Sequence, residues 1–308
     1  MLLYCVCLYF IKNYGKIQQF SVDFAQKIRG KISENGEREF EGLTGIPVCS
    51  RVKTGTKKNT LERKKTKRRE ESMKTGFIGL GIMGRPMAKN LLKAGVDLIV
   101  TDLNKEAVKD VVAAGAQEGT YEEIGKECGV VFIMVPSGDI TKSILFGEGG
   151  VASFIKEGSI VCDMSSVTPV ESKECYERLK EIGVGFVDAP VSGGETGGIN
   201  GTLAIMAGGD QKDFDALKTY FDILGSSALL IGGPGSGSVT KLANQIIVNN
   251  TIAVVSEAFV MAAKAGADPV KVYEAIRGGL AGSAVLDSKI PMIVERNFKP
   301  GGPIRINH

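Results

Sequence analysis

Residues 76–95 read GFIGLGIMGRPMAKNLLKAG, with five glycines and one proline in the pattern of a strand, a turn and a helix. This stretch contains the motif G-x-G-x-x-G. In such a unit the first glycine permits the tight turn, the second lets a pyrophosphate approach the backbone, and the third lets the helix pack against the strand. The helix N-terminus then faces the anion. We therefore expect a dinucleotide to bind the motif, which consists of Gly79, Leu80, Gly81, Ile82, Met83 and Gly84.

A second apolar run, residues 97–102, follows this helix and ends in Asp102. A carboxylate at this position accepts hydrogen bonds from the ribose hydroxyls of NAD and repels the 2′-phosphate of NADP. Lys105 follows shortly afterwards, and its positive charge would offset part of that repulsion. We therefore expect NAD as the cofactor, with NADP as the alternative.

From Met73 onward, apolar strand-like runs alternate with amphipathic helix-like stretches. The strand-like runs are 75–80, 97–102, 129–135, 159–164, 184–189, 203–207 and 227–231, and the helix-like stretches include 86–94, 106–114 and 169–182. This alternation predicts an α/β fold, a Rossmann-type doubly wound sheet that is mostly parallel and has helices on both faces. We assign this domain to residues 73–233 and expect a partial all-α domain over 234–308.

Residues 1–72 differ in composition from the rest of the chain. They carry 16 Lys and Arg against 8 Asp and Glu, whereas acids outnumber bases 27 to 22 from Met73 onward. The charged run at 51–69 has no apolar periodicity, which is typical of a solvated tail. The apolar start, MLLYCVCLYFI, is too short to span a bilayer and lacks the features of a signal peptide. We interpret 1–72 as a disordered extension or a result of start-site choice, and we expect neither a membrane nor a nucleic acid as partner.

The cysteines and the single histidine limit the chemistry. The six cysteines form no C-x-x-C pair, which favours buried reduced thiols and a cytoplasmic protein. The only histidine is the last residue, His308. Its position excludes histidine-based acid–base catalysis, Ser–His–Asp triads and most zinc sites from the folded body. We expect no metal site.

Lys241 is the best candidate for a proton donor. It lies near the start of a long apolar helix-like stretch, residues 238–265, which leaves little room for a solvated face. Burial in such a helix lowers the pKa of a lysine toward values useful in acid–base catalysis. Asn244 and Gln245 follow one turn later and lie beside Lys241. Periodicity alone leaves open the alternative that this polar strip faces solvent.

The stretch Ser192-Gly193-Gly194 follows the strand-like run at 184–189. In open α/β sheets, ligands bind at the carboxyl ends of the strands. Exposed N–H groups and the Ser192 hydroxyl can hold a carboxylate through charge-assisted hydrogen bonds. The remaining glycines, through Gly201, would let the chain reverse beside this site. A simple loop is the alternative.

From about Lys74 to its end, the chain resembles the β-hydroxyacid dehydrogenase family, which includes 3-hydroxyisobutyrate dehydrogenases and tartronate semialdehyde reductases. The matching stretches are GFIGLGIMGRPMAKNL at the start, DMSS at 163–166, DAPVSGGETGGINGTLAIMAGG at 188–209, GPGSGSVTKLANQ at 233–245 and AIRGGLAGSAVLDSKIPM at 275–292. The last stretch, and Gln245 where many relatives carry Asn, are most similar to the branch that acts on tartronate semialdehyde.

The resemblance also implies roles for particular residues. It makes Lys241 the catalytic lysine, with Asn244 and Gln245 beside it as substrate-binding residues. It assigns the acid group of the substrate to Ser192, Gly193 and Gly194. It further implies cofactor contacts at three strand ends, which are Val135, Pro136 and Ser166. Ser165, Asp163 and Asp188 receive no role.

The activity that the resemblance implies is NAD-dependent reduction of 2-hydroxy-3-oxopropionate (tartronate semialdehyde) to glycerate. One alternative substrate is 3-hydroxyisobutyrate or another short β-hydroxyacid. Family members have a longer helical domain than the 75 residues that follow Gly233 here. We therefore expect exposed apolar surface on the long helix and a homo-oligomer. A non-catalytic dinucleotide-binding protein is the alternative from a different class.

Overall fold

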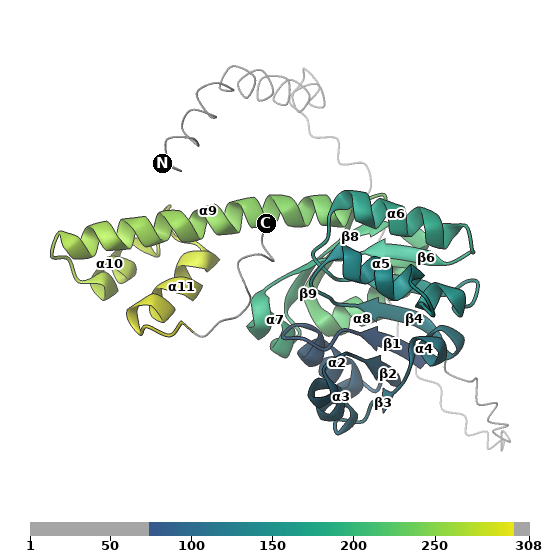
Figure 1. The fold of residues 1–308 in the computed structure, drawn as a ribbon. Helices are drawn as coiled ribbons and strands as arrows, with labels where there is room; N and C mark the ends of the chain where they lie inside the picture. The colour runs from purple at the N-terminus through teal and green to yellow at the C-terminus, as the bar shows by residue number, and fades with distance from the viewer. Residues whose placement is uncertain (1–73, 299–308) are drawn as a thin grey trace, which may run out of the picture. The chain divides into compact units, whose positions relative to one another are not determined.

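The structure, a computed structural model, describes residues 74–298. The expectations for residues 1–72 and for His308 lie outside the described residues. A sheet with helices on both faces forms the centre of the described part (Figure 1). The strands are β1 (Lys74–Ile78), β2 (Leu98–Thr101), β3 (Gln117–Glu118), β4 (Cys128–Ile133), β5 (Ile160–Asp163), β6 (Gly185–Asp188), β7 (Val191–Ser192), β8 (Leu203–Gly209) and β9 (Gly225–Gly232).

The strands pair in the order β3-β2-β1-β4-β5-β6-β8-β7, and β9 pairs with β8. Strands β1 to β6 are parallel, β8 is antiparallel to β6 and β7, and β9 is parallel to β8. The order reverses between β1 and β4, and a doubly wound sheet binds dinucleotides at such a switch point. The predicted α/β, Rossmann-type fold is confirmed.

Helices connect most of these strands. They are α2 (Gly84–Lys93), α3 (Lys105–Val112), α4 (Tyr121–Glu127), α5 (Gly138–Phe146), α6 (Pro169–Lys180), α7 (Gly194–Asn200), α8 (Gln211–Leu224), α9 (Ser236–Lys264), α10 (Pro269–Ile276) and α11 (Ala284–Val294), with a 3₁₀ turn at Val151–Ser153. Helix α2 ends where Gly95, at φ 86°, adopts the left-handed conformation. The Val96 N–H then donates to the Leu91 carbonyl at 3.1 Å, which closes the helix in a Schellman motif.

The core lies on both faces of the sheet. Phe77 belongs to one buried cluster and Ile78 to the other, because successive strand residues point to opposite faces. Helices α2, α3 and α8 contribute side chains to the first cluster, and α4, α5 and α6 contribute to the second. Burial on both faces explains why the strands read as continuous apolar runs. Cys128, Cys162 and Cys175 are buried free thiols, as the sequence predicts.

The glycine-rich segment after Ser192 reverses the chain, as predicted, because the flanking strands β7 and β8 are antiparallel. It does so through the short helix α7, which the sequence does not predict and which is capped by Gly201 at φ 65°. A Cβ on Gly197 would lie 3.1 Å from Leu203, and one on Gly198 would lie 3.4 Å from Pro86. The glycines thus allow α7 to pack closely against β8 and α2.

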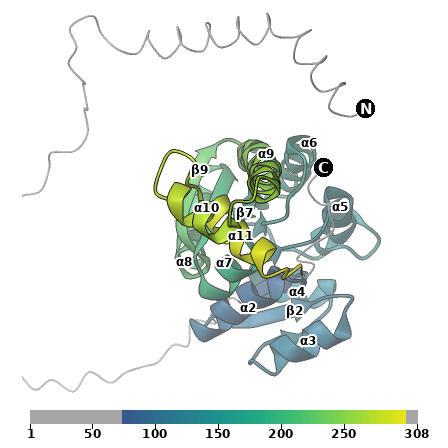
Figure 2. The ribbon, with the colours of Figure 1, turned by 90° about the vertical axis from the view of Figure 1, so that its left-hand side faces the viewer.

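The end of the described chain is helical. Helices α10 and α11 lie on the same side of the C-terminal half of α9 (Figure 2). A small cluster joins the three helices and consists of Val255, Phe259, Tyr273, Leu286 and Ile290. Helix α11 continues through Pro291 to Val294.

Much of α9 is exposed and apolar, as predicted. Its exposed apolar side chains include Val239, Leu242, Ile246, Ile247, Val254, Val260 and Met261. By length and composition, α9 is the one helix among residues 74–298 that could cross a membrane. This is weak evidence, because a helix of a soluble protein passes the same test. The first turn of α9 contains buried residues and packs against the sheet.

Candidate active site

The glycine motif connects β1 to α2. A Cβ on Gly79 would collide with the Met134 carbonyl oxygen, and a Cβ on Gly84 would collide with that of Gly79. The fold therefore requires glycine at both positions. At Gly81, in contrast, a Cβ would meet nothing within 4 Å. The space above Gly81 is open, as a ligand that approaches the backbone requires.

The start of α2 adds electrostatic support for an anion. The N-cap residue, Met83, makes no side-chain hydrogen bond to the helix, and the first turn contains no acidic residue. The positive end of the helix dipole is therefore not compensated by a carboxylate of its own first turn. This end of α2 and the open space above Gly81 together fit the pyrophosphate of a dinucleotide.

Asp102 lies beside the glycine motif. Its carboxylate accepts hydrogen bonds from the N–H of Leu80 and, at 2.7 Å, from the N–H of Asn104. The Lys105 ammonium lies 2.8 Å from a carboxylate oxygen of Glu118 at the end of β3. The charge of Lys105 is thus partly compensated by Glu118.

The carboxyl ends of β4 and β5 lie side by side, across the switch point from β1 and β2. The buried Ser165 hydroxyl accepts a hydrogen bond from the Val135 N–H at 2.9 Å, and the Ser165 N–H donates to Asp163 at 2.9 Å. Ser166 is exposed. Ser165, to which the sequence assigns no role, therefore joins the segment that holds Val135 and Pro136 to the DMSS segment.

Strand β7 and helix α9 bring Lys241 close to the Ser192 segment. The partly buried Lys241 ammonium donates a hydrogen bond to the carbonyl oxygen of Val191 at 2.7 Å. Burial lowers the pKa of Lys241 from its ordinary value. Gly193 and Gly194 follow in left-handed conformations, with φ 138° and 62°. A lysine with a lowered pKa thus lies next to backbone that can accommodate a carboxylate.

Asn244 and Gln245 lie one turn further along α9. Both are partly buried, and the Asn244 amide donates a hydrogen bond to the Gln245 side-chain oxygen at 2.9 Å. Helical spacing puts them on the side of α9 that carries Lys241. The structure therefore places Lys241 at the residue before Ser192, with Asn244 and Gln245 one helical turn further along α9.

Asp188 is a buried residue that the sequence analysis leaves without a role. Its carboxylate accepts hydrogen bonds from the backbone N–H groups of Gly235 and Ser238, both at 2.8 Å. Burial raises the pKa of Asp188 to about 6. The position of Asp188 at a strand end is visible in the sequence, but its partners lie about fifty residues further along the chain.

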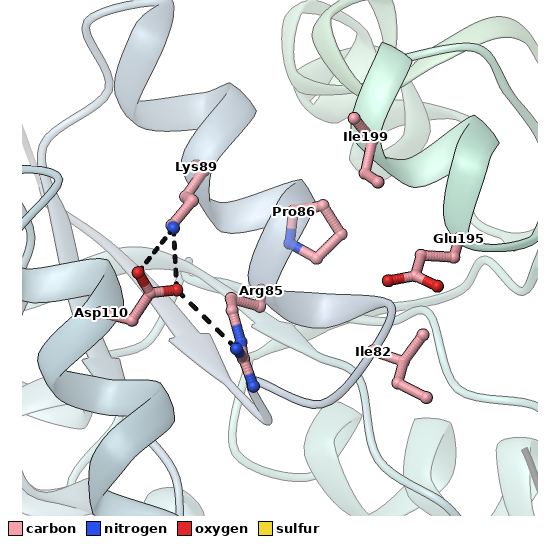
Figure 3. Close-up of a pocket in the computed structure, with 7 residues that line it drawn as sticks. All are labelled: Ile82, Arg85, Pro86, Lys89, Asp110, Glu195 and Ile199. Carbon is pink, nitrogen blue, oxygen red and sulfur yellow. Dashed lines mark hydrogen bonds and ion pairs between the residues drawn. The ribbon is translucent and has the colours of Figure 1, made fainter. Parts of the chain in front are cut away.

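A cavity of about 380 Å³ lies between α2 and α7 (Figure 3). Asp110 on one side of it pairs with Lys89 at 2.8 Å and with Arg85 at 3.8 Å. Ile82 of the glycine motif also lines the cavity, but neither Lys241 nor Ser192 does. Among residues 74–298, no group of three His, Cys, Asp or Glu residues could hold a metal ion.

Two known families match the chain. Residues 74–233 match the NAD binding domain of 6-phosphogluconate dehydrogenase. Residues 235–308 match the family described as NAD-binding of NADP-dependent 3-hydroxyisobutyrate dehydrogenase. The two matches meet at the start of α9.

Individual relatives agree with these matches. The 2-hydroxy-3-oxopropionate reductase of Escherichia coli is 43% identical over 76% of this chain and 80% of its own length. The 2-(hydroxymethyl)glutarate dehydrogenase of Eubacterium barkeri is 35% identical over 78% of this chain and 80% of its own. A crystal structure of 3-hydroxyisobutyrate dehydrogenase from Salmonella typhimurium superimposes with a TM-score of 0.70 at 28% identity. That match covers 76% of this chain and 83% of the other.

Proposed function

Since the chain belongs to the β-hydroxyacid dehydrogenase family, whose members are NAD(P)-dependent oxidoreductases acting on CH–OH groups, we propose that it reduces 2-hydroxy-3-oxopropionate (tartronate semialdehyde) to glycerate. The observation that carries this proposal is the hydrogen bond from the partly buried Lys241 to Val191, the residue before Ser192, in a chain similar to a reductase of that substrate. The family is known for several short hydroxyacids, so the substrate itself is part of the proposal.

In this mechanism the chain's own residues bind both reactants and supply the proton. The glycine motif and the start of α2 would hold the pyrophosphate of the dinucleotide, and Asp102 would accept hydrogen bonds from its ribose. Val135, Pro136 and Ser166 would line the nicotinamide half. When bound, NADH would supply the hydride that reduces the aldehyde carbon.

The remaining residues act on the substrate. The Ser192 hydroxyl and the N–H groups of Gly193 and Gly194 bind the carboxylate. Lys241, held by the Val191 carbonyl, donates its proton to the aldehyde oxygen as the hydroxyl group forms. Asn244 and Gln245 orient the substrate beside Lys241. In the reverse oxidation, neutral Lys241 accepts the hydroxyl proton.

The substrate proposal is tested by comparing kcat/KM for a panel of compounds. The panel contains glycerate, 3-hydroxyisobutyrate and 2-(hydroxymethyl)glutarate, each oxidised with NAD. We expect the highest value for glycerate, the product of tartronate semialdehyde reduction. A higher value for one of the other two would move the chain to another branch of the family. Binding of NADH without turnover of any compound would support the non-catalytic alternative.

Replacing Asp102 by Asn is expected to weaken the preference for NAD. Loss of one negative charge near the ribose removes about 1.4 kcal/mol of repulsion, so the ratio of kcat/KM for NADPH over NADH should rise about tenfold. Asp97→Asn is a matched control, because Asp97 is an exposed acid just before the opposite end of β2. An unchanged ratio in Asp102→Asn would contradict the role of Asp102.

A second copy of the chain is proposed to cover the exposed apolar side of α9. Ile246 and Ile247 are 65% and 67% exposed, and apolar side chains continue along the helix. Soluble monomers rarely expose so extended an apolar surface. Ile246→Asp should therefore lower the mass measured by light scattering to that of a monomer. Ile182→Asp, which changes an exposed isoleucine just after α6, should not. Equal masses for the two variants would contradict this interface.

Two further assignments belong to the same proposal. The dinucleotide-binding domain comprises residues 73–233 and the helical domain residues 234–308, a division supported by the two family matches on either side of Pro234. We also propose that the enzyme is cytoplasmic. The buried thiols of Cys128, Cys162 and Cys175 support a reducing compartment.

A further inference from the structure

Two contacts join the start of α9 to the segment that follows β6. The Asp188 carboxylate binds the N–H groups of Gly235 and Ser238, and the Lys241 ammonium binds the carbonyl of Val191. Ser238 precedes Lys241 by one helical turn, and Val191 precedes Ser192 directly. The same two segments therefore carry the proposed proton donor and the proposed carboxylate site.

Asp188 supplies the hydrogen-bond acceptor and the negative charge that the first turn of α9 lacks. The N-cap residue is Gly235, which has no side chain, and the first turn contains no acidic residue. Gly237 and Ser238 are buried, so water does not replace a missing acceptor there. A buried N–H without a partner costs about 1–3 kcal/mol. The ionised carboxylate of Asp188 satisfies two such groups and faces the positive end of the helix dipole.

Close packing around Asp188 restricts the position of the first turn of α9. A Cβ on Gly237 would lie 2.5 Å from the Asp188 carbonyl oxygen, and one on Gly208 would lie 2.6 Å from the Asp188 carboxylate. The Ser238 hydroxyl also lies 2.9 Å from that of Ser172 on α6, in a buried contact. The first turn of α9 therefore has little freedom to slide or rotate against β6, β8 and α6.

We propose that Asp188 is a positioning residue, whose carboxylate fixes the first turn of α9 and so places the Lys241 ammonium at Val191 and Ser192. This inference rests on the proposed role of Lys241 as proton donor. Asp188 acts through the helix and does not itself contact the substrate.

Asp188→Asn tests this directly. Asn has one acceptor oxygen where Asp has two, and its NH₂ group would face a backbone N–H donor. The first turn should move, and Lys241 should become more solvated. The pKa of Lys241 should therefore rise by about one unit toward its ordinary value. A purely electrostatic role of Asp188 predicts the opposite sign, because loss of a negative charge lowers the pKa of a lysine.

The pKa of Lys241 is measured in the full chain by competitive labelling with acetic anhydride over a range of pH, followed by mass spectrometry of the Lys241 peptide. The matched control is Asp213→Asn. Asp213 is also buried, and its carboxylate packs at the opposite end of β6, where a Cβ on Gly185 would lie 2.6 Å away. We expect a rise in Asp188→Asn and no change in Asp213→Asn. An unchanged or lowered pKa in Asp188→Asn would overturn the proposal.

Two additional measurements complete the test. In Asp188→Asn, kcat should fall about 10- to 100-fold while the Kd of NADH is unchanged, because only the proton donor is displaced. If that variant fails to fold, Asp188→Glu, which keeps the charge but moves the carboxylate by one methylene, replaces it and should give a rise of the same sign. No rise in Asp188→Glu would then overturn the proposal. The labelling experiment requires no turnover, so it tests the position of Lys241 even if the chain does not catalyse the proposed reaction. A failure of this inference is therefore distinguishable from a failure of the proposed function.

Discussion

Replacing Lys241 by Met is expected to lower kcat for aldehyde reduction by about 10²- to 10⁴-fold, the usual contribution of a positioned proton donor. Met keeps the length and apolar character of the side chain, so the surroundings of Val191 should change little. Because the glycine motif does not contact Lys241, the Kd of NADH should stay the same. Stopped-flow absorbance at 340 nm and NADH fluorescence measure the two quantities.

Lys264→Met is the matched control for this variant. Lys264 lies in the last turn of the same helix and is exposed, so its loss should leave kcat unchanged. Equal activity of Lys241→Met and the unmodified chain would remove Lys241 from the mechanism. A weaker NADH affinity in Lys241→Met would instead indicate damage to the fold.

The lowered pKa of Lys241 also sets the pH dependence. Reduction requires the protonated lysine, so its rate should fall as the pH rises through a pKa below the ordinary value of 10.5. Oxidation of the hydroxyacid requires the neutral lysine and should rise over the same interval. Both pH dependences should disappear in Lys241→Met. If that variant kept the same pH dependence as the unmodified chain, the titration would belong to another group.

Gly81→Val is expected to weaken dinucleotide binding strongly and leave the fold intact. Nothing lies within 4 Å of a Cβ at this position, so the free energy of unfolding should change by no more than about 0.5 kcal/mol. The new side chain would fill the space reserved for the pyrophosphate. Loss of about two charge-assisted hydrogen bonds, roughly 3 kcal/mol, corresponds to a Kd for NADH about 100-fold weaker.

Gly278→Val is the control, because a Cβ on Gly278 also meets nothing within 4 Å and Gly278 lies outside the dinucleotide-binding domain. Calorimetric titration with NADH and thermal unfolding are measured for both variants. Tight binding of NADH by Gly81→Val would contradict the assignment of the pyrophosphate to this loop. Gly84→Ala should behave differently and lose stability, since its Cβ collides with the Gly79 carbonyl.

Much of the fold is predictable because its signals are local. The glycine motif, the apolar runs of the strands and Gly95 at the end of α2 each follow from the chemistry of a few neighbouring residues. The strands β3 and β7 carry no such signal, since each has only two residues. Helix α7 is missed because its glycines look like a loop, whereas they provide close contacts with Leu203 and Pro86.

The candidate site is less predictable because its contacts are distant in sequence. Lys241 and Val191 are 50 residues apart, and Asp188 is 47 residues from Gly235. The apolar helix does indicate a buried lysine, but not the carbonyl that receives its hydrogen bond. Nor does the sequence show that Ser165, rather than Ser166, joins β4 to β5. Such pairings depend on the register of the sheet and on the packing of α9.

The most direct test of the central claim is a turnover with NADH that carries deuterium at the transferable position of nicotinamide C4. Tartronate semialdehyde is added to the full chain, and the product is analysed by mass spectrometry. The proposed reaction predicts glycerate with one deuterium on C3, the former aldehyde carbon, and its formation by Lys241→Met about 10²- to 10⁴-fold more slowly. Binding of NADH without formation of deuterated glycerate would contradict it.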